Sequence, residues 1–158
     1  MEAILLTHAE VAVAVAGFAS VVAAFQRPLA PVQRNRFLAI LLSSLVQILA
    51  CLVPIWLSES QAAGPDLWRL SSLLFLGAIV VAGITMVYPL KNLGMTGIVV
   101  MNLPVTILLW FLTAVSVGAL IANVLVVSAP GFRLYYATLL AGLCVVFLTF
   151  ADVATRDD

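Results

Sequence analysis

Five long apolar runs, separated by short polar or proline-containing segments, dominate the hydrophobic pattern of this chain. A helix needs about 20 predominantly apolar residues to cross about 30 Å of hydrocarbon. Each run meets this length. The pattern therefore predicts an all-α, polytopic transmembrane helical bundle, whose five spans cover approximately residues 3–25, 37–57, 68–88, 105–127 and 134–153.

Prolines and charged residues mark the expected boundaries of the spans. The first run ends at Gln26-Arg27-Pro28, and the third ends at Tyr88-Pro89. A tight turn is expected over residues 128–131, and Pro104 is expected in the first turn of the fourth helix. Residues 94–102 are left with two interpretations, a segment along the membrane interface or a re-entrant segment.

The composition agrees with a membrane protein. Of the 158 residues, 65% are hydrophobic and 9% are charged, whereas soluble domains contain roughly 25% charged residues. Residues 1–158 are therefore expected to form a single integral membrane domain in contact with membrane lipid. Seven Lys/Arg balance seven Asp/Glu without forming a basic stripe, which argues against a nucleic-acid partner.

The positions of the basic residues predict the orientation, because cytoplasmic loops collect Lys and Arg. Two arginines, Arg69 and Arg133, fall on one side of the predicted bundle. The other side has five basic residues, which are Arg27, Arg34, Arg36, Lys91 and Arg156. The N-terminus is therefore predicted outside and the C-terminus in the cytoplasm.

The first predicted helix carries two rows of mainly small residues at helical spacing. One row contains Ala3, Thr7, Glu10, Ala14, Gly17, Val21 and Ala24. The other contains Ala9, Ala12, Ala16, Ala19 and Ala23. Small residues let helix backbones approach closely in a membrane. Two such rows imply neighbours on both sides, so the first helix is expected to be central.

Glu10 is a carboxylate inside an apolar span, where a charge is costly unless it is paired or reaches water. It falls in the outer third of the bilayer, near His8, and Arg69 and Arg133 enter the third and fifth helices from the same side. The first interpretation is a structural ion pair between Glu10 and one of these arginines. The alternatives are a carboxylate that handles ions or protons, and a side chain that snorkels to water.

Polar residues recur along the fourth predicted helix, and the second predicted helix also contributes one candidate. In lipid they are expected to point inward, either as interhelical hydrogen-bonding groups or as the lining of a polar path. These candidate residues are Asn102, Thr106, Thr113, Ser116 and Asn123 of the fourth helix, and Gln47 of the second.

The sequence predicts no catalytic, cofactor-binding or metal-binding residues. There is one histidine, and Cys51 and Cys144 are isolated within apolar runs, which does not provide a four-ligand metal site. No phosphate-binding loop or nucleophile motif is present. An enzyme is therefore not expected.

Ala9-Glu10-Val11, followed by Gly17-Phe18-Ala19 and the arginine-bearing segment from Gln26 to Arg36, resembles the start of a group of short uncharacterised bacterial inner-membrane proteins. Those proteins open with an Ala-Glu…Gly-Phe helix. The resemblance covers mainly the first 40 residues. It implies a multi-pass protein of the bacterial inner membrane and carries no activity.

These features favour a small inner-membrane protein that acts through assembly, as a homo-oligomer or as an accessory subunit of a membrane complex. Short loops and small-residue helix faces support that function. The alternative is an ion or proton channel or transporter subunit, in which Glu10 and the polar face of the fourth helix line a path.

Overall fold

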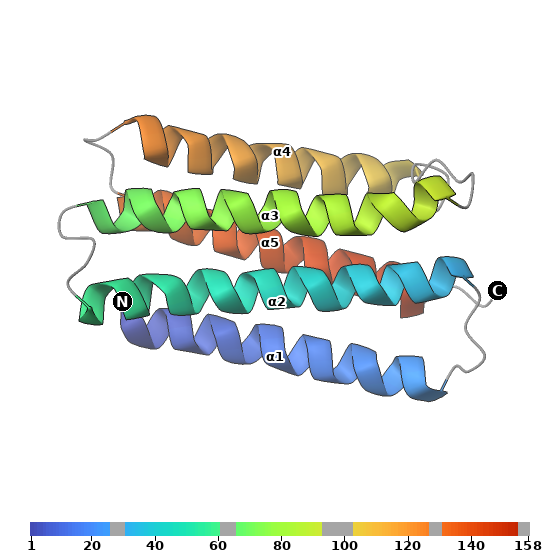
Figure 1. The fold of residues 1–158 in the computed structure, drawn as a ribbon. Helices are drawn as coiled ribbons and strands as arrows, with labels where there is room; N and C mark the ends of the chain where they lie inside the picture. Colours follow the sequence, from blue (N-terminus) through green and yellow to red (C-terminus); the bar gives the residue numbers. More distant parts are fainter. Residues whose placement is uncertain (26–30, 61–65, 93–102, 127–130, 155–158) are drawn as a thin grey trace.

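The protein is a bundle of five helices, and the computed structural model describes residues 1–25, 31–60, 66–92, 103–126 and 131–154 (Figure 1). Each helix contains a segment long and apolar enough to cross a membrane. This confirms the predicted all-α, five-span architecture. In chain order the helices are α1 (Glu2–Phe25), α2 (Pro31–Glu59), α3 (Leu67–Asn92), α4 (Leu103–Leu125) and α5 (Gly131–Ala154).

The helices run alternately up and down, so the two chain ends lie at opposite ends of the bundle (Figure 1). Helices α1 to α4 follow one another across the view, and α5 lies behind them. Helix α2 packs against α1, α3 and α5, and α4 packs against α3 and α5. Helix α1 packs mainly on α2 and only lightly on α5. The expectation that the first helix is central is therefore wrong for this chain.

Only one small-residue row of α1 is used inside the protomer. Ala9, Ala12 and Ala19 are buried and Ala16 and Ala23 are half-buried, so this row faces the bundle. The other row is exposed along its whole length, and we call it the Glu10 row: Ala3, Thr7, Glu10, Ala14, Gly17, Val21 and Ala24. The sequence pattern indicated two packing faces, and one of them has no neighbour within this chain among the residues described.

Several helix ends differ from the prediction. Helix α2 begins at Pro31, six residues before the predicted start, because proline is well suited to the first helical position. Helix α3 continues through Pro89 to Asn92, and transmembrane helices tolerate such a proline. Helix α5 already begins at Gly131. The prediction for Pro104, in the first turn of α4, is confirmed. Residues 94–102 lie outside the described part of the chain.

Two apolar clusters hold the helices together. The first surrounds Tyr135 and includes Phe75, Leu120 and Leu139. The second contains Phe37, Ile40, Val146 and Val153. On α2 and α5, the residues between the two clusters line a cavity, so the middle of the bundle is less completely filled than its two ends.

Candidate functional site

The predicted ion pair of Glu10 is not formed within the protomer. Glu10, Arg69 and Arg133 are all exposed. Among the described residues, no ion pair links Glu10 to either arginine. Arg69 and Arg133 are each the third residue of their helix, whereas Glu10 lies well inside α1. Glu10 therefore points away from the bundle from within a membrane-spanning segment.

His8, the neighbour predicted for Glu10, faces the opposite way and contacts α2. It is buried, and its Nε2 atom lies 3.2 Å from Oε1 of Gln47. Because Oε1 is an acceptor, the His8 Nε2–H donates this hydrogen bond. The His8 ring also meets the ring of Tyr136 edge-on, with 6.3 Å between the ring centroids. The structure thus joins His8 to Gln47 and separates both from Glu10.

The Gln47 side chain lies against a glycine of the neighbouring helix, which leaves room for its amide group. A Cβ atom placed on Gly142 of α5 would overlap the amide nitrogen Nε2 of Gln47. No substituent larger than hydrogen fits there unless the glutamine moves. The α2–α5 contact is therefore built around the Gln47 amide group.

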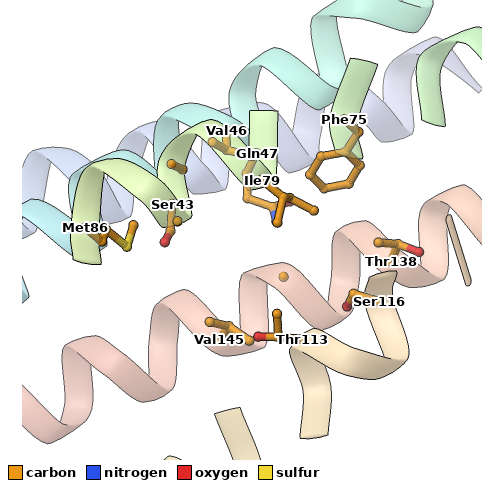
Figure 2. A pocket seen from close by; sticks show the side chains of 13 residues that line it. Ser43, Val46, Gln47, Phe75, Ile79, Met86, Thr113, Ser116, Thr138 and Val145 are labelled. Carbon is orange, nitrogen blue, oxygen red and sulfur yellow. The ribbon is translucent and has the colours of Figure 1, made fainter. Parts of the chain in front are cut away.

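A cavity of about 230 Å³ lies beside Gln47, between α2, α3, α4 and α5 (Figure 2). We call it the central cavity. Most of its wall is apolar, and Figure 2 shows Phe75, Ile79 and Met86 facing Val145 across it. The polar side chains that line it are Ser43, Gln47, Thr113, Ser116 and Thr138.

The predicted polar residues of α4 divide between two roles. Thr113 and Ser116 line the central cavity, and Thr106 is buried. Asn123 lies near the C-terminal end of α4, where its Nδ2 donates to Ser72 Oγ over 2.8 Å and more weakly to the carbonyl of Trp68. Asn102 lies outside the described residues. One part of the row thus joins α4 to α3 by a hydrogen bond, and another part lines a cavity.

Tyr135 forms a hydrogen bond that the sequence analysis missed. Its hydroxyl donates to the backbone carbonyl of Ala50 over 2.6 Å. That carbonyl would normally accept the amide hydrogen of residue 54, but residue 54 is a proline inside α2 and has none. Tyr135 therefore satisfies the backbone acceptor that Pro54 leaves open. The signal was present in the sequence, since Pro54 points to a free acceptor four residues earlier.

Two apolar hollows that share Val11 lie between α1 and α5 on the outside of the bundle, and together we call them the α1/α5 groove. Its first part, of about 420 Å³, is lined by Ala3, Ile4, Thr7, His8, Val11, Tyr136, Leu140 and Leu143. Its second part, of about 410 Å³, is lined by Val11, Ala14, Val15, Phe18, Phe147 and Phe150. Three members of the Glu10 row, Ala3, Thr7 and Ala14, belong to its wall.

Two further charged residues, Arg36 and Asp152, are buried at the opposite end of the bundle from Tyr135. Their chain neighbours Phe37 and Val153 belong to the same apolar cluster, which brings this part of α2 close to this part of α5. The predicted second span starts at residue 37 and leaves Arg36 outside the bundle. The earlier start of α2 brings it into the bundle.

No protein-family model, curated protein or solved structure matches this chain.

Proposed function

We propose that this small integral membrane protein acts through assembly, and that a second copy packs against the Glu10 row and the α1/α5 groove. The observation that carries the proposal is the outward position of Glu10 within a membrane-spanning helix. A charged side chain facing lipid at the bilayer centre costs about 2.5 to 3.5 kcal/mol, and less toward the interface. A neighbouring protein that supplies a cation removes this cost.

Snorkelling is the weaker explanation for Glu10. The residue lies eight positions after Glu2, the first residue of α1, which corresponds to about 12 Å of helical rise. Lys and Arg reach water from such depths because their stems are long. Glutamate has only two methylene groups and does not reach as far. A partner at the level of Glu10 therefore explains its position better.

The rest of the row is suited to close helix packing. Ala14 and Gly17 follow Glu10 on the same exposed face. A Cβ atom added at Gly17 would meet no atom of another helix within 4 Å. Small residues at such a face allow another helix to approach closely. This also supplies the second neighbour that the two small-residue rows of α1 predict.

Charge complementarity favours a second copy as the occupant. The contact between the His8 and Tyr136 rings sets these residues at one level. Arg133 precedes Tyr136 by three residues and Glu10 follows His8 by two, so about 8 Å of helical rise separates Glu10 from Arg133. A two-fold axis along the membrane normal keeps this difference in depth between copies. The long arginine stem reaches toward Glu10 of the other copy, twice in each dimer.

The channel or transporter alternative has less support. Thr113 and Ser116 of α4 face the central cavity, whereas Glu10 faces outward from α1. Within one chain, a path past Glu10 and the polar face of α4 would have to cross α2 or α5, so such a path would have to form between copies. The proposal includes no catalytic step. Placement in the bacterial inner membrane, with the N-terminus outside, is proposed from the sequence resemblance and the Lys/Arg distribution.

The test compares two glycine substitutions that a single protomer tolerates equally. Neither Gly17 on α1 nor Gly118 on α4 has an atom within 4 Å of an added Cβ, and both are exposed. The stoichiometry of wild type, Gly17→Leu and Gly118→Leu is measured by light scattering in detergent and by single-molecule photobleaching in nanodiscs. We expect dimers for wild type and Gly118→Leu, and folded monomers for Gly17→Leu.

A charge exchange tests the proposed pair. Glu10→Arg should lower the dimer fraction, and Glu10→Arg combined with Arg133→Glu should restore it. A wild-type protein that stays monomeric in nanodiscs at every protein density contradicts the proposal. A monomer that co-purifies with a different membrane protein, and loses it in Gly17→Leu, supports the accessory-subunit function in its place.

A further inference from the structure

The central cavity contains hydrogen-bonding groups that the fold does not use. Thr113 and Thr138 also line it, but their hydroxyls donate to the carbonyls of Leu109 and Leu134 within their own helices. The hydroxyl of Ser116 differs. Its residue is only 7% exposed, and its Oγ atom has no hydrogen-bond partner. A buried hydroxyl without a partner costs about 1–3 kcal/mol. A ligand in the cavity that accepted a hydrogen bond from Ser116 would remove this cost.

Gln47 supplies a second unused donor. Its Oε1 atom accepts the hydrogen bond from His8, which fixes the orientation of the amide group. Its Nε2 atom lies against Gly142, and it donates a hydrogen bond to none of the described residues. Both Gln47 and Ser116 are wall residues of the same cavity. The cavity therefore offers a fixed amide donor and a free hydroxyl.

The remaining wall defines the chemistry of the ligand. No charged side chain lines the described cavity, and Val46, Phe75, Ile79 and Met86 make most of one side apolar. An ion would lose its hydration there without compensation. An uncharged molecule with an apolar frame and an oxygen acceptor matches both parts of the wall.

We propose that the central cavity binds a small, uncharged, carbonyl-bearing apolar molecule from the membrane, whose oxygen accepts hydrogen bonds from Ser116 and Gln47. The volume of about 230 Å³ fits a compact single-ring compound. None of its wall residues belongs to the α1/α5 groove, and the proposal does not require a second copy of the chain.

Duroquinone and durene provide a matched pair of probes. Both are six-membered rings with four methyl groups, but only duroquinone has carbonyl oxygens, and its full substitution prevents addition of Cys thiols. Binding of radiolabelled duroquinone to the full-length protein in nanodiscs is measured by equilibrium dialysis, with empty nanodiscs subtracted. We expect saturable binding of one molecule per protomer. Unlabelled durene should compete at least about tenfold more weakly than unlabelled duroquinone, because it forms neither hydrogen bond.

Three variants locate the binding. Ser116→Ala removes a hydroxyl that bonds to nothing in the protein, so it should weaken duroquinone binding about fivefold and leave the fold intact. Ala82→Leu fills the cavity from α3 and should reduce binding to the level of empty nanodiscs. Thr85→Val, an exposed change on the same helix, is the control and should bind as wild type does.

Two results overturn the proposal. One is equal competition by durene and duroquinone, which would make the carbonyl irrelevant. The other is wild-type duroquinone binding by a folded Ala82→Leu protein, which would place the molecule in surrounding lipid. If Ala82→Leu does not fold, Val145→Phe fills the same cavity from α5 and decides the question in the same way.

Discussion

The hydrogen bond from Tyr135 to the carbonyl of Ala50 should stabilise the bundle only because Pro54 is present. Tyr135→Phe removes the hydroxyl and keeps the ring, which packs against Trp68 and Phe75 at centroid distances of 5.5 and 5.8 Å. The Ala50 carbonyl then has neither the tyrosine hydroxyl nor an amide hydrogen from residue 54. The substitution therefore isolates one hydrogen bond.

The expected cost follows from the burial of this bond. Tyr135 has no exposed surface, so water does not replace the lost donor. Leaving a buried acceptor unpaired costs about 1–3 kcal/mol, and hydrogen bonds between membrane helices contribute about 0.6 to 2 kcal/mol. We expect Tyr135→Phe to lower the free energy of unfolding by about 1.5 kcal/mol, within these two ranges.

The decisive comparison is a double-mutant cycle with Pro54→Ala. Alanine supplies the missing amide hydrogen, so the Ala50 carbonyl keeps one partner when Tyr135 is changed to Phe. In this background the Tyr135→Phe cost should fall to about 0.5 kcal/mol or less, a coupling of about 1 kcal/mol. Any cavity created at the buried Pro54 is present in both arms of the cycle and cancels.

Unfolding is measured by titrating dodecyl sulfate into mixed micelles and following helicity by circular dichroism. Circular dichroism avoids the direct effect of Tyr135 on the nearby Trp68 fluorescence. Equal costs of Tyr135→Phe in the wild-type and Pro54→Ala backgrounds would refute the reasoning, because the hydroxyl would then not be substituting for the missing amide.

Four other substitutions test three further contacts. Arg36→Met or Asp152→Asn alone should lower the free energy of unfolding by about 3 kcal/mol, because each leaves a buried charge uncompensated. In the same titration, the double variant should be at least about 1 kcal/mol more stable than the sum of the two single costs predicts. Additive costs would contradict an interaction between Arg36 and Asp152. Gly142→Ala displaces the Gln47 amide and so breaks its hydrogen bond to buried His8, which should cost about 1–3 kcal/mol, and a wild-type unfolding midpoint would contradict this. His8→Phe should weaken duroquinone binding about fivefold by releasing the Gln47 amide, and unchanged affinity in a folded variant would contradict that role.

The spans could be predicted from the sequence because apolar runs of this length have few other solutions in a membrane. The ends were harder to predict. Pro31, Pro89 and Gly131 resemble breaks in the sequence, but each lies within a helix. A proline at the first helical position loses no hydrogen bond, and a transmembrane helix continues past an internal proline when neighbouring groups compensate. Those neighbours belong to the tertiary structure, which local sequence does not specify.

The faces of α1 likewise separate what local sequence predicts from what the tertiary structure decides. Helical spacing predicted its two small-residue rows correctly, but it did not distinguish the row of Ala12 from the row of Glu10. Which row packs inside the bundle depends on the side chains that α2 and α5 place against α1. His8 shows this most clearly. It forms a hydrogen bond to Gln47 of α2, which lies 39 positions away in the sequence, whereas Glu10, two residues from His8, faces outward. Expecting Glu10 and His8 to act together overlooked their different directions around the helix.

His8 lies where the two proposed sites meet. It lines the α1/α5 groove, and its hydrogen bond holds the Gln47 amide that faces the central cavity. The other side-chain hydrogen bonds of α1, from Thr7 and Ser20, end on its own backbone, so in the described chain only His8 ties α1 to another helix in this way. A second copy that shifts α1 as it packs would therefore move the donor that orients Gln47. Because linkage is reciprocal, a change in duroquinone affinity between the wild-type dimer and monomeric Gly17→Leu would require the ligand to change dimer stability by the same factor.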